Sequence, residues 1–302
     1  MVDICLLGTG AMKPLPDRWL TSLYISCNGK GILCDCGEGT QVAIAKKRIS
    51  PKHIDIICIT HFHGDHIAGL PGLLLTMGNS DRTEPVRIIG PKGITEVVSA
   101  LRVIAPELPF ELVFTELTEE EQEMESRPYK IKGFRVKHSI SCYSFVINVP
   151  RSGKFNSDKA EKNRVPQEYW CRLQKGDIVR EGKRIFTPDM VMGPPRQGIK
   201  IVYSTDTRPL DITAENAENA DLFICEGTYG DDSKMDRALQ YGHMTFREAA
   251  LLGKKADVKR MWLTHYSPSV PDPEEYIGEA QKILPIIETA FDGRTITLNY
   301  EE

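Results

Sequence analysis

Long hydrophobic segments are missing from this chain of 302 residues. No apolar run approaches the roughly 20 residues that a membrane-spanning helix requires, and the opening MVDICLLGTG lacks the three regions of a signal peptide. With 41% hydrophobic and 26% charged residues, the composition excludes disorder, collagen and coiled coil. We therefore expect a globular cytoplasmic protein that does not contact a membrane.

Cysteines at metal-binding or disulfide spacings are also scarce. Most of the eight cysteines lie in apolar strand-like segments such as IICIT and LFIC, where a buried thiol packs like a small apolar side chain. Cys34 and Cys36 form a CxC, but no second pair or nearby histidine completes a zinc knuckle. We expect free thiols and no disulfide framework.

Short β-branched segments alternate with segments of helical periodicity. The strand-like segments are 2–8, 23–27, 31–36, 54–60, 86–90, 134–138, 144–149, 199–204, 221–226, 258–265 and 295–300. Helical periodicity marks 40–48, 67–78, 94–105, 245–255 and 273–291. Many strands follow one another without an intervening helix, so the sequence predicts an α/β fold with mixed sheets.

Charge is unevenly distributed along the chain. Residues 151–196 hold eleven Lys and Arg against six Asp and Glu, a net charge of +5, whereas the whole chain has a net charge of −4. A basic insertion in an acidic body indicates a polyanionic partner. The alternative is a solvated surface segment with a chance excess of basic residues.

The strongest local signal is THFHGDH at residues 60–66, between a strand-like and a helical segment. Clustered histidines gain little from burial unless each ring nitrogen finds a partner. In an extended segment His61 and His63 point the same way, and Asp65 and His66 follow at the helix start, after a sharp turn that Gly64 would permit. The motif predicts ligands for two adjacent metal ions.

The other histidines differ in their surroundings. His138 and His265 end strand-like segments, and Asp206 follows another, so all three could lie at a loop rim and bind metal. His53 has no polar cluster around it and is typical of a surface residue. His243 stands beside a helix start, where a role near the helix cap is the alternative to a functional one.

Seven motifs together make the sequence resemble the metallo-β-lactamase superfamily, and more closely its ribonuclease Z family of endonucleases, which remove 3′ trailers from precursor tRNA. The HxHxDH motif alone indicates only the superfamily. The basic arm ending in GPPRQG narrows the resemblance to the ribonuclease Z family. The motifs are LLGTGA, LCDCGEGTQ, THFHGDHIAGLPGLL, KHSISCYSF, GKFNSDKAEKNRVP continuing to MGPPRQG, YSTDTRP and LTHYSP.

The resemblance implies a four-layer αβ/βα sandwich formed by residues 1–150 and 197–302, with a tRNA-binding arm inserted at 151–196. It also implies a homodimer. It further implies two zinc ions per chain, with Mn²⁺ or Fe²⁺ as alternatives, and seven ligands: His61, His63 and His138 on one ion, Asp65, His66 and His265 on the other, and Asp206 bridging both.

The resemblance also implies roles around the metals. Asp35 would orient a ligand imidazole, Asp65 could accept a proton from the nucleophile, and Glu226 with His243 would protonate the leaving group. The products would be a tRNA with a 3′-hydroxyl and a trailer with a 5′-phosphate. Contacts to precursor tRNA would come from six basic residues: Arg18, Arg151, Lys154, Lys159, Lys162 and Arg164.

Three motifs depart from the family pattern. Cys225 replaces a histidine, Pro16 replaces a lysine in the loop that senses the first trailer nucleotides, and Gln167-Glu168 replaces the Gly-Pro at the tip of the arm. The alternative function on the same fold is a two-zinc hydrolase of small phosphodiesters or sulfate esters.

Overall fold

The computed structural model describes residues 1–301 and divides into two compact units. One comprises Met1–Asn148 and Lys200–Asn299; the other comprises Val149–Ile199 with residues 300–301. These limits fall within about three residues of the expected limits of the insertion.

The larger unit contains two seven-stranded sheets. The first has the order β16-β1-β2-β3-β4-β5-β6, in which β3, β4, β5 and β6 run parallel and the other pairs are antiparallel. Its strands are β1 (Val2–Gly8), β2 (Ser22–Cys27), β3 (Lys30–Cys34), β4 (Ile54–Cys58), β5 (Val86–Pro91), β6 (Leu112–Leu117) and β16 (Arg294–Leu298).

The second sheet has the order β15-β14-β13-β12-β9-β8-β7, in which β12 to β15 run parallel. Its pairs β7-β8 and β8-β9 are antiparallel. Its strands are β7 (Glu121–Ser126), β8 (Tyr129–Val136), β9 (Cys142–Arg151), β12 (Arg196–Ser204), β13 (Leu222–Glu226), β14 (Met261–Thr264) and β15 (Ile287–Thr289).

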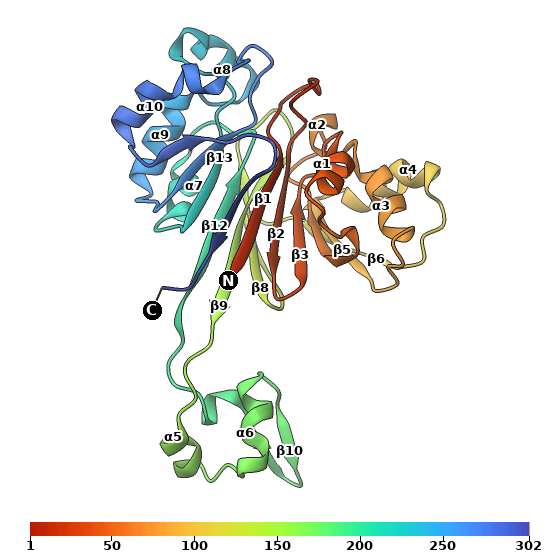
Figure 1. Cartoon of the computed structure of the whole chain (residues 1–302), viewed down its shortest axis with the longest axis vertical. Coiled ribbons are helices and arrows are strands. Elements are labelled where there is room, and N and C mark those ends of the chain that lie inside the picture. Colours follow the sequence, from red (N-terminus) through yellow and green to blue (C-terminus); the bar gives the residue numbers. More distant parts are fainter. Residues whose placement is uncertain (302) are drawn as a thin grey trace. The chain divides into compact units, whose positions relative to one another are not determined.

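Helices cover the outer face of each sheet (Figure 1). The first sheet packs against α1 (Thr40–Lys46), α3 (Leu70–Gly78) and α4 (Ile94–Leu101), and the second against α7 (Asp211–Ala217), α9 (Phe246–Lys255) and α10 (Ile277–Ile283). Alternate strand residues face these helices and the rest face the opposite sheet, so central strands such as β4, β13 and β14 are buried on both faces. The α/β class and the metallo-β-lactamase sandwich of mixed sheets are thereby confirmed.

One predicted helix is wrong in its extent. The helical pattern at 273–291 becomes α10, which ends at Ile283, and then β15 pairs with β14. Leu284 takes an extended conformation, as the residue before a proline usually does, and Pro285 cannot continue the helical hydrogen bonds. Beyond it Ile287 is buried in an edge strand instead.

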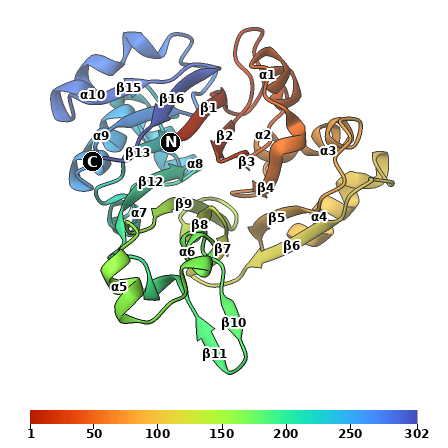
Figure 2. The ribbon, with the colours of Figure 1, turned by 60° about the horizontal axis from the view of Figure 1, so that its bottom comes forward.

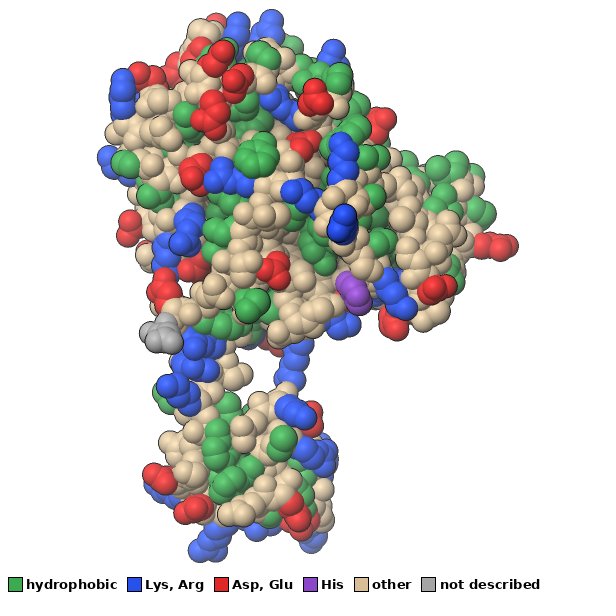
Figure 3. Space-filling view, viewed as in Figure 1, with side chains coloured by type: hydrophobic (Ala, Val, Ile, Leu, Met, Phe, Trp, Pro, Cys, Tyr) green, Lys and Arg blue, Asp and Glu red, His purple; other side chains and the backbone are tan. Residues whose placement is uncertain are grey.

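The inserted unit is folded around its own core, and its binding of a polyanionic partner stays a prediction. It contains α5 (Ser157–Lys162), α6 (Gln167–Gln174) and the hairpin of β10 (Val179–Glu181) and β11 (Arg184–Phe186), visible in Figure 2. Its buried residues are Ala160, Val165, Leu173, Val179, Phe186 and Val191. Lys and Arg side chains lie over its surface among Asp and Glu (Figure 3).

The remaining expectations concern membranes and thiols. Among residues 1–301 no helix is both long and apolar enough to cross a bilayer. All eight cysteines are free thiols, and seven of them are buried, as the sequence predicted. Cys171 is the exposed one.

Candidate metal centre and active site

The candidate site lies where parallel strands of both sheets end. In the first sheet Asp35 follows β3 and His61 follows β4 after a short loop. In the second sheet Asp206 follows β12, Glu226 ends β13 and His265 follows β14. Because strands paired in parallel end at the same edge, residues far apart in sequence meet there.

Three of these residues have left-handed backbone conformations. The φ angles are 58° at Asp35, 54° at Asp206 and 60° at His265. Such angles are uncommon outside glycine and cost on the order of 1–3 kcal/mol each, and they cluster at functional sites. Packing around the strand ends therefore holds these side chains in fixed directions.

The HxHxDH segment forms a strand-to-helix turn as the sequence predicted. His63 is the N-cap of the short helix α2 (Gly64–Ile67), which carries Asp65 and His66. The predicted reason for Gly64 is wrong, because its φ is not positive and a Cβ there would meet no atom within 4 Å. The turn therefore does not depend on the conformational freedom of glycine.

A first group of ligand atoms surrounds His63. Its Nδ1 lies 2.9 Å from His61 Nε2 and 3.2 Å from His138 Nε2. Asp206 Oδ2 lies 3.6 Å from the Nε2 atoms of both His61 and His138. Three imidazoles and one carboxylate oxygen thus face one point.

A second group forms around His66 and His265, whose Nε2 atoms are 3.2 Å apart. Asp65 Oδ2 lies 3.8 Å from His66 Nε2 and 3.5 Å from His265 Nε2. Asp206 Oδ1 lies 3.1 Å from each of the same two nitrogens. The two oxygens of Asp206 therefore face different groups, the geometry of a bridging carboxylate.

Outer hydrogen bonds occupy Nδ1 of three histidines whose Nε2 atoms face the ligand groups: His66, His138 and His265. His66 Nδ1 donates to Asp35, and His138 Nδ1 points at the Gly242 carbonyl, which can only accept. Thr228 donates to Glu226, so it accepts from His265 Nδ1. In the neutral form of His66, His138 and His265, Nε2 then carries the lone pair.

Metal ions fit this arrangement. Asp206 Oδ1 is buried and receives no hydrogen bond, and the Nε2 atoms of His66 and His265 each lie 3.1 Å from it. Burial lowers the pKa of His66, but the carboxylates of Asp206 and Asp35 outweigh it and hold that pKa well above the ordinary value. The centre thus requires positive charge, and N and O donors in two groups suit divalent ions.

Glu226 is fully buried, and each oxygen of its carboxylate accepts two hydrogen bonds. Oε1 accepts from the Thr207 amide at 2.6 Å and from His243 Nδ1 at 3.3 Å. Oε2 accepts from the Thr228 hydroxyl at 2.6 Å and from the Met244 amide at 2.9 Å. Glu226 therefore positions His243 directly and a metal-facing histidine through Thr228.

His243 stands at the edge of both ligand groups. Its ring centroid is 5.1 Å from that of His138 and 5.4 Å from that of His265. Burial lowers the pKa of His243, but Glu226 outweighs it and raises that pKa to about 9. A protonated imidazole next to the metal centre can donate a proton.

Cys225 takes no part in this arrangement. It precedes Glu226 on β13, and adjacent strand residues face opposite sides of a sheet. Its side chain belongs to the core beneath the helices of the second sheet. The missing histidine of the family pattern therefore leaves no gap at the metals.

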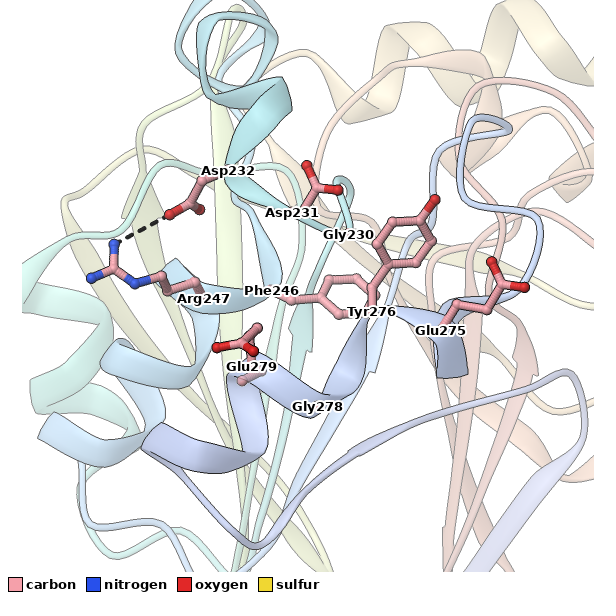
Figure 4. A pocket seen from close by; sticks show the side chains of 10 residues that line it. Gly230, Asp231, Asp232, Phe246, Arg247, Glu275, Tyr276, Gly278 and Glu279 are labelled. Atoms are coloured by element: carbon pink, nitrogen blue, oxygen red, sulfur yellow. Dashed lines mark hydrogen bonds and ion pairs between the residues drawn. The ribbon is translucent and has the colours of Figure 1, made fainter.

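The cavity over the metal centre has a volume of about 440 Å³ and is lined by Met12, Tyr229, Arg237 and Ser267 besides the site residues. A larger cavity of about 590 Å³ lies between α9 and α10 (Figure 4). It contains no histidine, and four carboxylates surround its one cation, Arg247. An anionic substrate therefore fits the cavity over the metal centre better than the acidic cavity between α9 and α10.

The predicted substrate-binding residues have varied surroundings. Arg18 donates to the carbonyls of Val270 and Pro271 and lies over the Tyr266 ring, so its described contacts are within the chain. In the inserted unit Arg151 donates to the Glu301 carbonyl and Lys159 to the Met192 carbonyl. Three cations are exposed and have no hydrogen bond or ion pair to residues 1–301: Lys154, Lys162 and Arg164.

Sequence reasoning missed the hydroxyl groups that orient the histidines. Thr60 donates to Asp35 and lies 3.0 Å from His61 Nδ1, and the Tyr203 hydroxyl reaches Asp35 from the other sheet at 3.0 Å. Thr228 has the same role beside His265. The only available signal was the position of Thr60 and Thr228 next to the motifs at two strand ends.

Known proteins are similar over the whole chain. Ribonuclease Z of Lachnoclostridium phytofermentans is 55% identical over 302 residues, covering 100% of this chain and 99% of that protein. Ribonuclease Z of Agathobacter rectalis is 52% identical, with 100% of both chains covered. The crystal structure of human tRNase Z, short form, is 27% identical with a TM-score of 0.72, covering 98% and 99%.

Two family models match parts of the chain. One described as anti-Pycsar protein Apyc1 matches residues 2–173, and one described as a β-lactamase superfamily domain matches 190–266. Both matches cover strands and ligands of the site described above. With full-length relatives above 50% identity, the chain belongs to the ribonuclease Z family of the metallo-β-lactamase superfamily.

Proposed function

We propose that this protein removes the 3′ trailer from precursor tRNA by hydrolysing one phosphodiester bond, leaving a 3′-hydroxyl on the tRNA. It is a metal-dependent endoribonuclease of the ribonuclease Z type. The observation that carries the mechanism is Asp206, whose two oxygens face separate groups of histidines. Full-length similarity to ribonucleases Z supports the substrate.

Two divalent ions, zinc by preference, would occupy the two ligand groups. When bound, such ions activate water and neutralise the phosphodiester oxygens. His61, His63 and His138 would hold one ion, and Asp65, His66 and His265 the other. Burial lowers the pKa of both His61 and His138, which keeps these rings neutral and ready to bind metal.

The protein's own groups move the protons. Asp65 Oδ2 faces the site and accepts the Met12 amide hydrogen at 2.7 Å, which fixes the carboxylate where it can take the proton of the attacking water. His243 donates a proton to the 3′ oxygen as that oxygen leaves phosphorus. Glu226 does not touch substrate; it keeps His243 charged and correctly turned.

The alternative is a hydrolase of small phosphodiesters or sulfate esters with the same metal centre. The inserted unit favours tRNA, because its net positive charge and its exposed Lys154, Lys162 and Arg164 suit phosphate contacts over a large polyanion. A small substrate would use none of these residues. A homodimer and a cytoplasmic location stay predictions.

The test is cleavage of a precursor tRNA labelled at its 5′ end, with the cut mapped to single-nucleotide resolution. We expect one product that ends in a 3′-hydroxyl after the nucleotide that follows the acceptor stem. His61→Ala, purified in parallel, is the control for contaminating nuclease. Hydrolysis of a small nitrophenyl diester without any cleavage of precursor tRNA would favour the alternative.

A further inference from the structure

A side cavity of about 400 Å³ opens beside the metal centre. It shares His138, Ser139, Gln240 and Tyr241 with the cavity over the metals, so the two are adjacent. The remaining lining includes Lys137, together with aliphatic groups of Leu210 and Leu239. Its volume is that of a small-ligand site, since such sites start near 300 Å³.

Several polar groups around this side cavity are available for a ligand. Lys137, Gln240 and Tyr241 are exposed, and their side chains make no hydrogen bond or ion pair with residues 1–301. The Tyr241 side chain is 52% exposed. Arg208, also in the lining, is held by Glu248 and is not available.

The short helix α8 (Met235–Tyr241) links this side cavity to the proton donor. Tyr241 is its last residue, and Gly242 follows with a φ of 76°, which only glycine adopts freely. His243 comes next, and its amide donates to the Ala238 carbonyl at 2.9 Å. One turn of backbone therefore fixes Tyr241 and His243 relative to each other.

We propose that the side cavity binds the nucleotide that carries the leaving 3′ oxygen, the last nucleotide of the cleaved tRNA product. Tyr241 stacks on its base, Gln240 contacts the base edge and Lys137 binds the phosphate on its 5′ side. The inference rests on the proposed function, because it takes His243 as the donor to that oxygen.

The chemistry of the cut decides which nucleotide lies there. A general acid must be within hydrogen-bond reach of the oxygen it protonates, so the ribose that bears this oxygen lies against His243. The base on the same ribose is then the one nearest to Tyr241. An exposed aromatic ring, an amide and a free ammonium group are the usual partners of a single-stranded nucleotide.

The experiment combines enzyme variants with precursor tRNAs that lack one base. Tyr241→Ala should raise KM for precursor tRNA roughly tenfold to a hundredfold, the usual effect of losing a base stack, whereas Tyr241→Phe keeps the ring and the wild-type KM. An abasic last tRNA nucleotide should raise KM at least as much for the wild type, and should have a much smaller further effect on Tyr241→Ala, in which only the contact with Gln240 remains to be lost. An abasic first trailer nucleotide should change KM by the same factor for the wild type and for Tyr241→Ala, so that the two effects multiply in KM.

The outcomes separate this inference from the proposed function. The effect of Tyr241→Ala could instead be non-additive with the abasic first trailer nucleotide, or additive with both abasic nucleotides. Either result would overturn the assignment of the side cavity to the last tRNA nucleotide, although the enzyme would still cleave precursor tRNA. If Tyr241→Ala did not fold, the wild type would be sufficient for the test. An unchanged KM of the wild type for the precursor tRNA with an abasic last tRNA nucleotide would then overturn the inference. Failure of the wild type to cut unmodified precursor tRNA would instead refute the proposed function.

Lys137 offers a second measurement. Lys137→Ala should weaken binding of precursor tRNA and lower the slope of log KM against log salt by about one, as for a single lost phosphate contact. The matched control is Lys254→Ala. Lys254 is also exposed, and it lies near the far end of α9, roughly 13 Å along the helix from the N-cap Thr245. Equal salt slopes for the two variants would contradict the role of Lys137.

Discussion

His66 donates its Nδ1 hydrogen to Asp35 Oδ2 at 2.8 Å, and both side chains are completely buried. Asp35 in turn accepts hydrogen bonds from the Thr60 amide and hydroxyl and from the Tyr203 hydroxyl. One carboxylate thus fixes the ring of a metal-facing histidine from beneath. Asp35 acts on the metal centre through this hydrogen bond and, by way of the Thr60 hydroxyl, through His61.

Asp35→Asn should therefore lower metal affinity by roughly 10- to 100-fold, as for other carboxylates that orient a metal-bound histidine. The amide has no charge and only one acceptor oxygen for the four hydrogen bonds that Asp35 accepts, so it holds the His66 ring less firmly. Competition with a chromogenic chelator measures the affinity, and circular dichroism checks the fold. Tyr203→Phe removes a neighbouring hydrogen bond without touching a ligand, and serves as the matched control. Unchanged affinity of Asp35→Asn would contradict this role.

The second prediction is that active protein contains two metal ions per chain, most readily zinc. His61→Ala should abolish phosphodiester hydrolysis with little loss of fold, because one ligand is a small part of the stability of the large unit. Elemental analysis of unchelated protein measures the stoichiometry. One equivalent or less in fully active protein would falsify the bridging role of Asp206.

Removing the proton donor should affect substrates unequally. His243→Ala should lower kcat on precursor tRNA by roughly 10²-fold or more, the usual contribution of general acid catalysis. Bis(p-nitrophenyl) phosphate has a leaving group that needs no proton, so its hydrolysis should fall much less. Metal content must be measured alongside. Equal losses on both substrates with metal retained would leave His243 as a structural or phosphate-binding residue.

The inserted unit should contribute binding but not chemistry. Replacing residues 151–196 by a short turn joins β9 and β12, which are neighbours in the sheet. The variant should show a raised KM for precursor tRNA and a weaker salt dependence, because fewer counterions are released. Small diesters should still be hydrolysed.

A milder variant of the same test keeps the fold of the inserted unit. Lys162 and Arg164 are exposed, and replacing both by Ser removes charge without removing any residue of its buried core. If tRNA affinity stayed unchanged in both variants, or if the deletion abolished hydrolysis of a small diester in folded protein, the proposed binding role would be wrong.

The sequence by itself determined the local parts of the site. His61, His63, Asp65 and His66 lie within six residues, so the strand-to-helix turn alone brings them together. Helical periodicity predicted a helix that starts at residue 245, and Thr245 is the N-cap of α9, with a capping box to Glu248. Strand periodicity fixed the α/β class, because alternate residues must face opposite sides of a sheet.

Tertiary structure decided what depends on distant segments. His138, Asp206 and His265 meet the motif only because their strands end at the same edge of the sandwich, and strand order cannot be read from periodicity. The tautomer of His265 depends on Thr228, which Glu226 holds from another strand. The segment after Pro285 became β15 because β14 offered it an edge to pair with. Burial and pairing between remote segments outweigh local propensity at such places.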